Sequence, residues 1–361
     1  MNRLVFLFAI SLVSINAYPQ EKSIPSDSTK KMKGQLIPLP AIYFTPETKL
    51  AVGCIGVYLF KTDKNVRTSN IDFAAVYTLN KQIIIEPIYN VFTKGEKFFI
   101  KGSVIFTKFP EFFYGIGNDT SKDTKENLSY KTFRVNNRVL RQQFPHMFIG
   151  FQHYYFNTFD VKFPQPSRYK PGSVPGDKGS ITSGIGPAFV YDSRDNILNA
   201  TKGIYAEFSS TLYRSVFGSE FKFTNFTVDV RSFNRINTHA VLAVQGLINF
   251  NFGHVPFKQQ STIGGYSVMR GYYNGRFRDK KLMVLQAEWR QHLYKRIGCT
   301  VFADVGEVSS EINGFSLDHT KATFGGGLRY QLSQNGKINI RFDAGFGRNT
   351  SGFYINISEA F

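Results

Sequence analysis

The feature that most constrains this chain is a period of two in the placement of its apolar residues. Residues 337–346 (KINIRFDAGF) alternate apolar side chains with polar side chains or glycine, and 204–213 and 322–331 show the same period. Successive side chains of a β-strand point to opposite faces, so this period predicts strands with one apolar and one polar face. From residue 39 onward, we expect about sixteen such strands.

Two all-β architectures give this pattern, namely a soluble sandwich and a membrane barrel. The amino-terminus favours the barrel, because residues 1–17 resemble a secretory signal peptide. Arg3 precedes an apolar run at 4–13, and a small-residue cleavage site ends at Ala17. Segments of about ten residues also match strands that cross an outer membrane. The predicted fold class is an all-β, transmembrane antiparallel β-barrel in the outer membrane of a Gram-negative bacterium.

The strand count also predicts the domain organisation and the topology. Residues 18–38 are rich in Lys, Ser and Pro and form a short periplasmic tail, and residues 39–361 form one barrel domain. An even strand count places both termini on the periplasmic side. The longest gaps between predicted strands then become outer loops, as barrels require. These gaps are 110–127, 159–181, 252–280 and 308–321.

Composition and motifs exclude several functions. After residue 17, no apolar run approaches the ~20 residues of a transmembrane helix. The formal charge of +18 fits anionic outer-membrane lipids, including lipopolysaccharide, better than nucleic acid, which an exported protein seldom meets. None of the six histidines lies in a nucleophile motif or has metal-ligand spacing. We therefore expect no enzyme activity, catalytic residue, metal or cofactor.

One group of residues, a loop motif and two carboxylates that follow it, says more about function than the other motifs. The gap 252–280 contains GGYSVMRGYY at 264–273, and the next two strands place Glu288 and Asp304 on their polar faces. The midpoint, (288 + 304)/2 = 296, falls in the predicted turn, so the two carboxylates should be near neighbours across the strands. Like charges at such positions require either a cation or the protonation of one of the two carboxyls. Arg270 comes from the preceding loop, and a guanidinium can engage carboxylates in a bidentate fashion.

The loop at 252–280 is therefore predicted to fold back into the lumen. Gly264 and Gly265, with Gly271 after the arginine, let it bend sharply and approach a wall. Arg270 would then hold it to Glu288 and Asp304. Two other interpretations stay open. The three residues could be purely structural, and the basic cluster of Arg270, Arg276, Arg278, Lys280 and Lys281 could bind lipopolysaccharide phosphates, line a pore or be solvated.

The motifs also resemble a known family. Residues 269–272 (MRGY) are similar to the V/I-R-G-F/Y signature of the BamA/TamA-type outer-membrane barrel superfamily, also called the bacterial surface antigen family. The segments 191–196 (YDSRDN), 302–306 (FADVG) and 325–329 (GGGLR) follow the family's order. The resemblance marks Arg270, Gly271 and Tyr272, with Glu288 and Asp304, as the loop-anchoring motif. It implies a short member, because a tail of about 20 residues cannot hold a periplasmic POTRA module.

The last predicted strand, 353–361, resembles an outer-membrane sorting signal. Its apolar face is formed by Phe353, Ile355, Ile357 and Phe361.

The expected function is to assist insertion or translocation of proteins or lipids at the outer membrane. The clients would be unfolded barrels or secreted proteins, and a periplasmic partner protein would supply the missing modules. The alternative is a loop-gated pore or a structural barrel with no protein client.

Overall fold

The computed structural model describes residues 34–45, 49–79, 81–333 and 338–361. The predicted signal peptide and most of the predicted tail lie outside these residues. Within them, the helices are 3-10 segments of three residues each, and none is long or apolar enough to span a membrane. The first strand begins at Gln35, four residues before the predicted start of the barrel.

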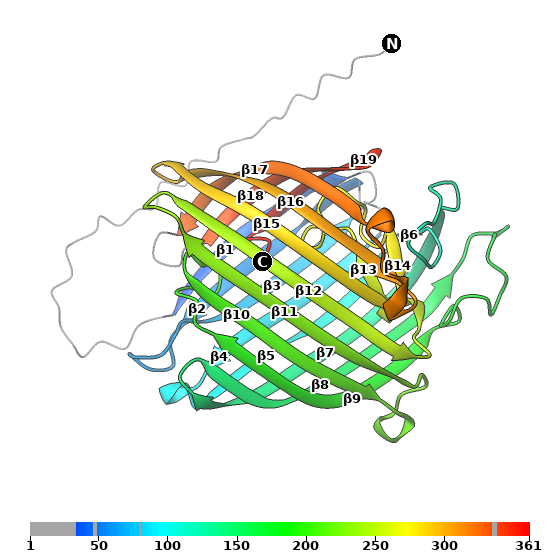
Figure 1. Ribbon diagram of the computed structural model, residues 1–361, viewed down its shortest axis with the longest axis horizontal. Coiled ribbons are helices and arrows are strands. Elements are labelled where there is room, and N and C mark those ends of the chain that lie inside the picture. The colour runs from blue at the N-terminus through cyan, green and yellow to red at the C-terminus, as the bar shows by residue number, and fades with distance from the viewer. Residues whose placement is uncertain (1–33, 46–48, 80, 334–337) are drawn as a thin grey trace, which may run out of the picture. The chain divides into compact units, whose positions relative to one another are not determined.

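In the described residues, sixteen strands form one continuous antiparallel ladder in which each pairs with the next in sequence, as predicted (Figure 1). The first eight are β1 (Gln35–Thr45), β2 (Lys49–Phe60), β3 (Ser69–Thr78), β4 (Ile83–Phe92), β5 (Phe98–Lys108), β7 (Glu126–Phe144), β8 (Met147–Lys162) and β9 (Ser180–Asp192). The second eight are β10 (Gly203–Tyr213), β11 (Phe223–Arg235), β12 (Ala240–Gly253), β15 (Lys281–Tyr294), β16 (Ile297–Ser309), β17 (Lys321–Ser333), β18 (Ile338–Gly347) and β19 (Thr350–Ile357).

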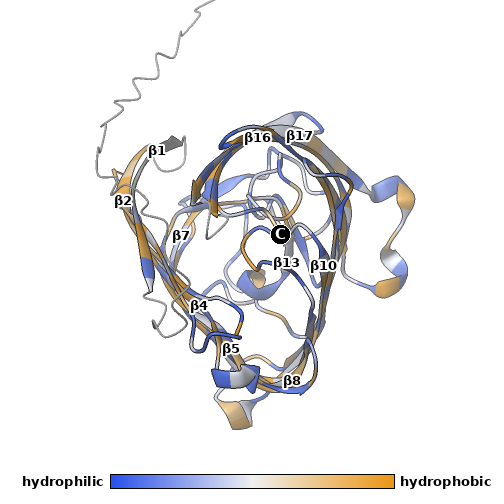
Figure 2. Cartoon of the chain, turned by 90° about the vertical axis from the view of Figure 1, so that its left-hand side faces the viewer, coloured by the Kyte–Doolittle hydropathy of each residue, from blue (hydrophilic) through white to orange (hydrophobic). Residues whose placement is uncertain are grey.

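Three further strands are short and belong to connections. β6 (Glu111–Phe113) pairs with the start of β7, while β13 (Ser261–Ile263) and β14 (Phe277–Asp279) pair with each other. β13 and β14 lie in the connection between β12 and β15, which we call the inner loop (residues 254–280). Viewed end-on, the ladder surrounds this loop and the carboxyl-terminus (Figure 2).

The distribution of side chains decides between barrel and sandwich. On β15, Gln286, Glu288 and Arg290 are buried inside, whereas Leu285 and Trp289, which alternate with them, are exposed on the outer surface. A soluble sandwich would bury the apolar face, whereas a membrane barrel turns it toward lipid. The structure therefore has the predicted barrel arrangement, with an apolar exterior and a polar lumen.

Both ends of the lumen contain packed apolar clusters. At the end with the short turns, the β2–β3 turn places Arg67 over the rings of Phe92 and Phe148 and beside the carboxylates of Glu96 and Asp192. At the end with the long loops, Phe113 and Phe257 pack edge to face within a cluster from three loops and β7. These ends are called the turn end and the loop end below.

The final residues depart from the sequence prediction. The last strand ends at Ile357 instead of continuing to Phe361, because Ser358 has a φ of +67°, which breaks the extended backbone. Phe353 and Ile355 stay on the outer face, but Phe361 turns into the lumen and packs against Phe233. The prediction that Phe361 shares one face with Phe353, Ile355 and Ile357 is therefore wrong.

Candidate functional site

The inner loop runs against the lumenal wall because glycines permit a close approach. Gly264, Gly265 and Gly271 have φ values of +111°, +102° and +117°, which side-chain-bearing residues rarely adopt. A Cβ added to Gly271 would lie 2.8 Å from the Phe346 nitrogen on β18. One added to Gly345 would lie 2.6 Å from the carbonyl carbon of Arg270. Loop and wall thus touch backbone to backbone.

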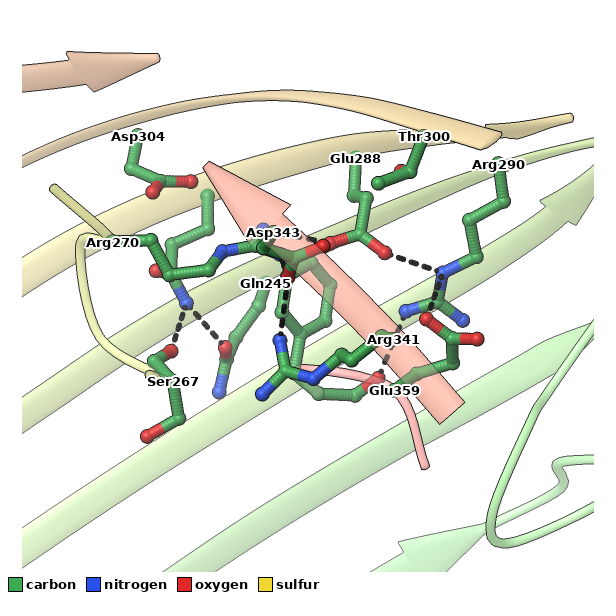
Figure 3. A network of polar contacts seen from close by, with 12 residues as sticks. Gln245, Ser267, Arg270, Glu288, Arg290, Thr300, Asp304, Arg341, Asp343 and Glu359 are labelled. Carbon is green, nitrogen blue, oxygen red and sulfur yellow. Dashed lines mark hydrogen bonds and ion pairs between the residues drawn. The ribbon is translucent and has the colours of Figure 1, made fainter. Parts of the chain in front are cut away.

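Arg270 lies at this contact and is completely buried (Figure 3). Its Nη2 donates to Glu288 Oε2 on β15 and its Nη1 donates to Asp343 Oδ2 on β18, each at 2.7 Å. The ring of Phe302 lies 3.5 Å from the guanidinium carbon. One side chain therefore joins the loop to two strands of the wall, in an arrangement we call the Arg270 clamp (Arg270, Glu288 and Asp343).

The clamp belongs to a larger buried ion network. Glu288 also accepts from Arg290 Nε at 2.8 Å, and Asp343 accepts from Arg329 Nη1 at 2.5 Å and from Arg341 Nη1 at 2.9 Å. Glu359, beyond the last strand, accepts from Arg329 Nε at 2.8 Å. Buried charges are tolerated when they are paired and hydrogen-bonded, as these are. The network thus connects the inner loop, three wall strands and the carboxyl-terminal segment.

Asp304 does not form the predicted ion pair with the Arg270 side chain, although its carboxylate lies beside the Arg270 backbone nitrogen. In the β15–β16 ladder it lies opposite Gln286, while Glu288 lies opposite Phe302. The ladder is centred at (286 + 304)/2 = 295, one residue before the value assumed from the turn, so the two carboxylates are offset along the strands. Asp304 Oδ2 accepts from the Thr323 hydroxyl at 3.0 Å, and among the described residues its carboxylate makes no ion pair.

Asp343 is the residue that sequence reasoning missed. Its place on the polar face of 337–346 was visible in the period of two. Its selection over Asp304 depends on how β18 is placed relative to β15, which no spacing along the chain specifies. Gly345 on β18 also admits the loop where a larger side chain would exclude it, and Gly325, opposite it on β17, leaves room for the Phe302 ring.

Tyr272, two residues after Arg270, is buried in the lumen. Its ring meets Phe277 edge to face at 5.4 Å in an apolar cluster with Met269. The carboxamide of Gln286 accepts from the Met269 backbone nitrogen at 2.8 Å and donates to the Ser267 carbonyl at 3.0 Å. The loop tip is therefore fixed by packing and hydrogen bonds as well as by charge.

A second set of ion pairs holds the base of the loop. Glu111 on β6 accepts from Lys258 Nζ at 2.6 Å and from Arg278, which also donates to the Phe257 carbonyl at 3.1 Å. We call Glu111, Lys258 and Arg278 the Glu111 clamp. Burial alone raises the pKa of the Glu111 carboxyl, but the adjacent Lys258 and Arg278 outweigh burial and lower that pKa to about 2.

The basic cluster predicted from the sequence is largely buried. Arg276, Arg278 and Lys281 each expose less than a tenth of their surface. Arg276 donates to the Thr120 carbonyl at 2.7 Å, and Lys281 donates to the carbonyl of Ser310. In this structure these three side chains are therefore turned away from lipid phosphates, because they bind other loops. The described residues contain no group of His, Cys, Asp or Glu suited to a metal ion.

A comparison with protein families assigns this barrel. The model of the Omp85 superfamily domain matches residues 107–361, which is well over half of the chain and includes both clamps. The chain belongs to the Omp85 superfamily. Barrels of this family reside in the bacterial outer membrane, cross it with many strands and are transporters or insertases, not enzymes.

Solved structures share the Omp85 fold at low identity. BamA from Haemophilus ducreyi lacking POTRA domains 1–3 matches with a TM-score of 0.56 at 13% identity, over 90% of this chain and 69% of that one. CdiB from Acinetobacter baumannii and CdiB from Escherichia coli each match with a TM-score of 0.56 at 10% identity, over 90% of this chain. This chain spans 60% and 61% of those two CdiB chains. No curated protein matches the sequence.

Proposed function

We propose that this Omp85 barrel assists the insertion or translocation of proteins or lipids at the outer membrane, together with a periplasmic partner protein. The observation that carries the proposal is the state of its two terminal strands. The ladder runs from β1 to β19, and within the described ranges no pairing joins β1 to β19. An unpaired strand edge is a template on which another strand can add.

The last strand supports this use of the edge. β19 has only eight residues, and Phe353 on it is 78% exposed, the largest value for an aromatic residue of any strand in the described part of the chain. Beyond Ile357 the chain turns inward instead of extending the sheet. In this proposal, the strand of a client would pair with β19, while the two clamps hold the inner loop inside the lumen.

The filled lumen supports an assembly role over an open pore. The inner loop, the aromatic cluster at the loop end and the cluster around Arg67 all occupy the interior. The alternative is a loop-gated pore or a barrel without a protein client. It is favoured by one observation, a polar cavity of about 340 Å³ inside the barrel.

Depletion of the protein tests the role. We expect a selective fall in other folded barrels, or in surface lipoproteins, of the outer membrane. Unchanged amounts of both classes would contradict the assembly role and favour the alternative.

A photo-crosslinking residue tests the edge itself. Placed at Phe353, it should capture client strands during assembly. Placed at Phe324 on β17, which is also a lipid-facing phenylalanine and is 65% exposed, it should not. Equal capture at both positions would show that contact is general to the outer surface and would contradict the proposal.

A further inference from the structure

The two free edges of the ladder, on β1 and β19, differ in the hydrogen bonds that they can offer. In an antiparallel ladder, the backbone N–H and C=O of one residue point to the same neighbouring strand, and successive residues alternate between the two sides. Leu79 N donates to Leu50 O at 2.9 Å, so the even-numbered residues of β2 face β3 and its odd-numbered residues face β1. The register pairs these with odd-numbered residues of β1, so the even-numbered residues of β1 face the free edge.

Prolines block the free edge of β1. Five of its residues have their backbone groups on this edge, namely Leu36, Pro38, Pro40, Ile42 and Phe44. A proline has no N–H, so neither proline can donate to an added strand. The edge therefore carries no donor between Leu36 and Ile42, which is a length of about 20 Å at the usual rise per residue. Prolines on an edge strand oppose the addition of another strand.

The free edge of β19 is intact. Ser358 N donates to Asn339 O at 2.8 Å, so the even-numbered residues of this register face β18. The odd-numbered residues of β19 therefore face the free edge, and they are Ser351, Phe353, Ile355 and Ile357. All four carry an N–H and a C=O, and in the described part of the chain none pairs with a strand on that side. β19 can thus bond an added strand along its whole length.

The inner loop holds β19 in place from inside the barrel. The Tyr354 hydroxyl accepts from the Gly271 nitrogen at 2.9 Å and donates to the Tyr272 carbonyl at 3.2 Å. The Thr350 hydroxyl donates to the Gly271 carbonyl at 3.1 Å. Both strand residues are even-numbered, so these contacts leave the free edge unobstructed. A template that is already fixed loses less conformational entropy when a strand is added.

The direction of β19 decides which strand can add to it. It runs from the loop end to the turn end, so an antiparallel partner runs from the turn end to the loop end, which we call outward. We propose that client strands add to β19 and not to β1, and that the entering strand runs outward. In an even-stranded barrel with both termini at the turn end, the first strand runs outward and the last runs inward. The client therefore enters by its first strand, or by another odd-numbered one, and not by its last. This inference rests on the proposed assembly role.

A peptide with the sequence of β18 (residues 338–347) is a suitable probe. β18 itself runs outward and pairs with β17. Gln331 N donates to Arg296 O at 2.8 Å, so the residues of β17 that face β18 are even-numbered, and Phe324 among them is exposed on the lipid-facing side. The edge-facing residues of β19, such as Phe353, are exposed on that side too. The peptide thus meets at β19 the kind of edge that β18 meets on β17.

Binding of a fluorescent form of this peptide to the purified full-length barrel tests the edge. I355P removes one N–H from the free edge, whereas I355A removes the side chain and keeps that N–H. We expect the peptide to bind I355P about fivefold or more weakly than I355A, because one hydrogen bond is lost. Neither variant removes a ladder bond to β18, and heat-dependent migration in gels reports their folding. Equal binding by the two folded variants would overturn the use of the β19 edge.

Photo-crosslinking locates the peptide without a change in the backbone. A photoreactive residue at Phe353 should capture it, and one at Leu36, which is 63% exposed on β1, should not. At Ser351 the captured part should be the carboxyl-terminal half of the peptide, and at Ile357 the amino-terminal half. Equal capture at Leu36 and Phe353 would overturn the one-sided addition, and the opposite order of the two halves would overturn the direction.

The variant P38V/P40V tests the prolines themselves. It restores both donors, so β1 should gain a strand partner, which is either the peptide or β19. In the presence of the peptide, the amide hydrogens of residues 35–45 should then exchange more slowly than in the wild type. Unchanged exchange would mean that the prolines do not block this edge.

These outcomes are distinguishable from failure of the assembly role. Addition of the peptide to β19, with no change in other barrels on depletion, would support the edge assignment and contradict the assembly role. A fall in other folded barrels on depletion, with the peptide captured at Leu36, would reject this inference and leave the assembly role standing.

Discussion

At the scale of the residue, Arg270 is the side chain that joins the inner loop to β15 and β18. It is completely buried, stacks on Phe302 and donates to carboxylates on two strands. A lysine has a single point of charge and cannot reproduce the forked geometry. Removing one partner of a buried ion pair leaves the others unpaired in a medium of low dielectric, which is costlier than removing an exposed pair.

R270A should therefore destabilise the barrel by about 3–5 kcal/mol and expose the inner loop to protease. R276A is the matched control from the same loop, because Arg276 donates hydrogen bonds to Thr120 but makes no ion pair among the described residues. It should cost only about 1 kcal/mol. The measurements are unfolding in urea followed by gel migration, and limited proteolysis. Unchanged protection of the loop in R270A would contradict the anchoring role.

The choice between Asp343 and Asp304 gives a second prediction at this scale. Asp343 accepts from three arginine side chains, whereas the neighbours of Asp304 are the Thr323 hydroxyl and the Arg270 backbone, and it makes no ion pair among the described residues. D343N should therefore lower the free energy of unfolding by about 2–4 kcal/mol more than D304N does. The same urea titration checks it. If D304N lowered the free energy of unfolding more than D343N, Asp304 and not Asp343 would be the main acidic partner of Arg270.

At the scale of the element, the Glu111 clamp makes the base of the inner loop sensitive to acid. The pKa of Glu111 is lowered from 4.5 to about 2 in the folded barrel. A lowered carboxyl pKa stabilises the folded state above the unfolded value, and that contribution is lost as pH falls from 4.5 through about 2. A shift of this size corresponds to the order of 3 kcal/mol.

Hydrogen exchange of residues 257–279 should thus accelerate, relative to E111Q, as pH falls from 5 to 2. At pH 5 the wild type should exchange more slowly than E111Q, and near pH 2 the two should converge. Segments of β3 serve as the internal reference, because β3 pairs with β2 and β4, which carry none of the clamp residues. A constant difference between the two proteins across this pH range would exclude Glu111 as the titrating group.

The elements also show what the sequence can predict. The period of two located all sixteen wall strands, because each strand has one face toward lipid and one toward the lumen. It did not locate β6, β13 or β14, whose three residues are too few for a period. It also predicted that the last strand continues beyond Ile357. The strand stops there because Ser358 has a positive φ, which depends on the tertiary structure and leaves no mark on the period. For the site, motifs identified Arg270, but the choice of Asp343 depends on the packing of strands distant in sequence.

At the scale of the whole molecule, two features bear on the choice between an assembly role and a pore. These are the filled interior and the unpaired terminal strands. Among the described residues, the clusters at the two ends and the inner loop between them occupy the lumen. The polar cavity is bounded by the loop itself, so release of the loop would enlarge it. A barrel that assembles clients needs an accessible edge, and a pore needs an open lumen.

Single-barrel conductance in planar bilayers distinguishes a pore from an assembly role. We expect the wild type to show no large steady conductance, because the inner loop fills the lumen. R270A should show larger and longer openings, since the loop tip loses its ion pairs to β15 and β18, and R276A should resemble the wild type. A large steady conductance in the wild type that R270A leaves unchanged would contradict the closed interior. An increase in R270A with normal levels of other folded barrels in the cell would mean that the clamp gates a pore, and the assembly role would then be wrong.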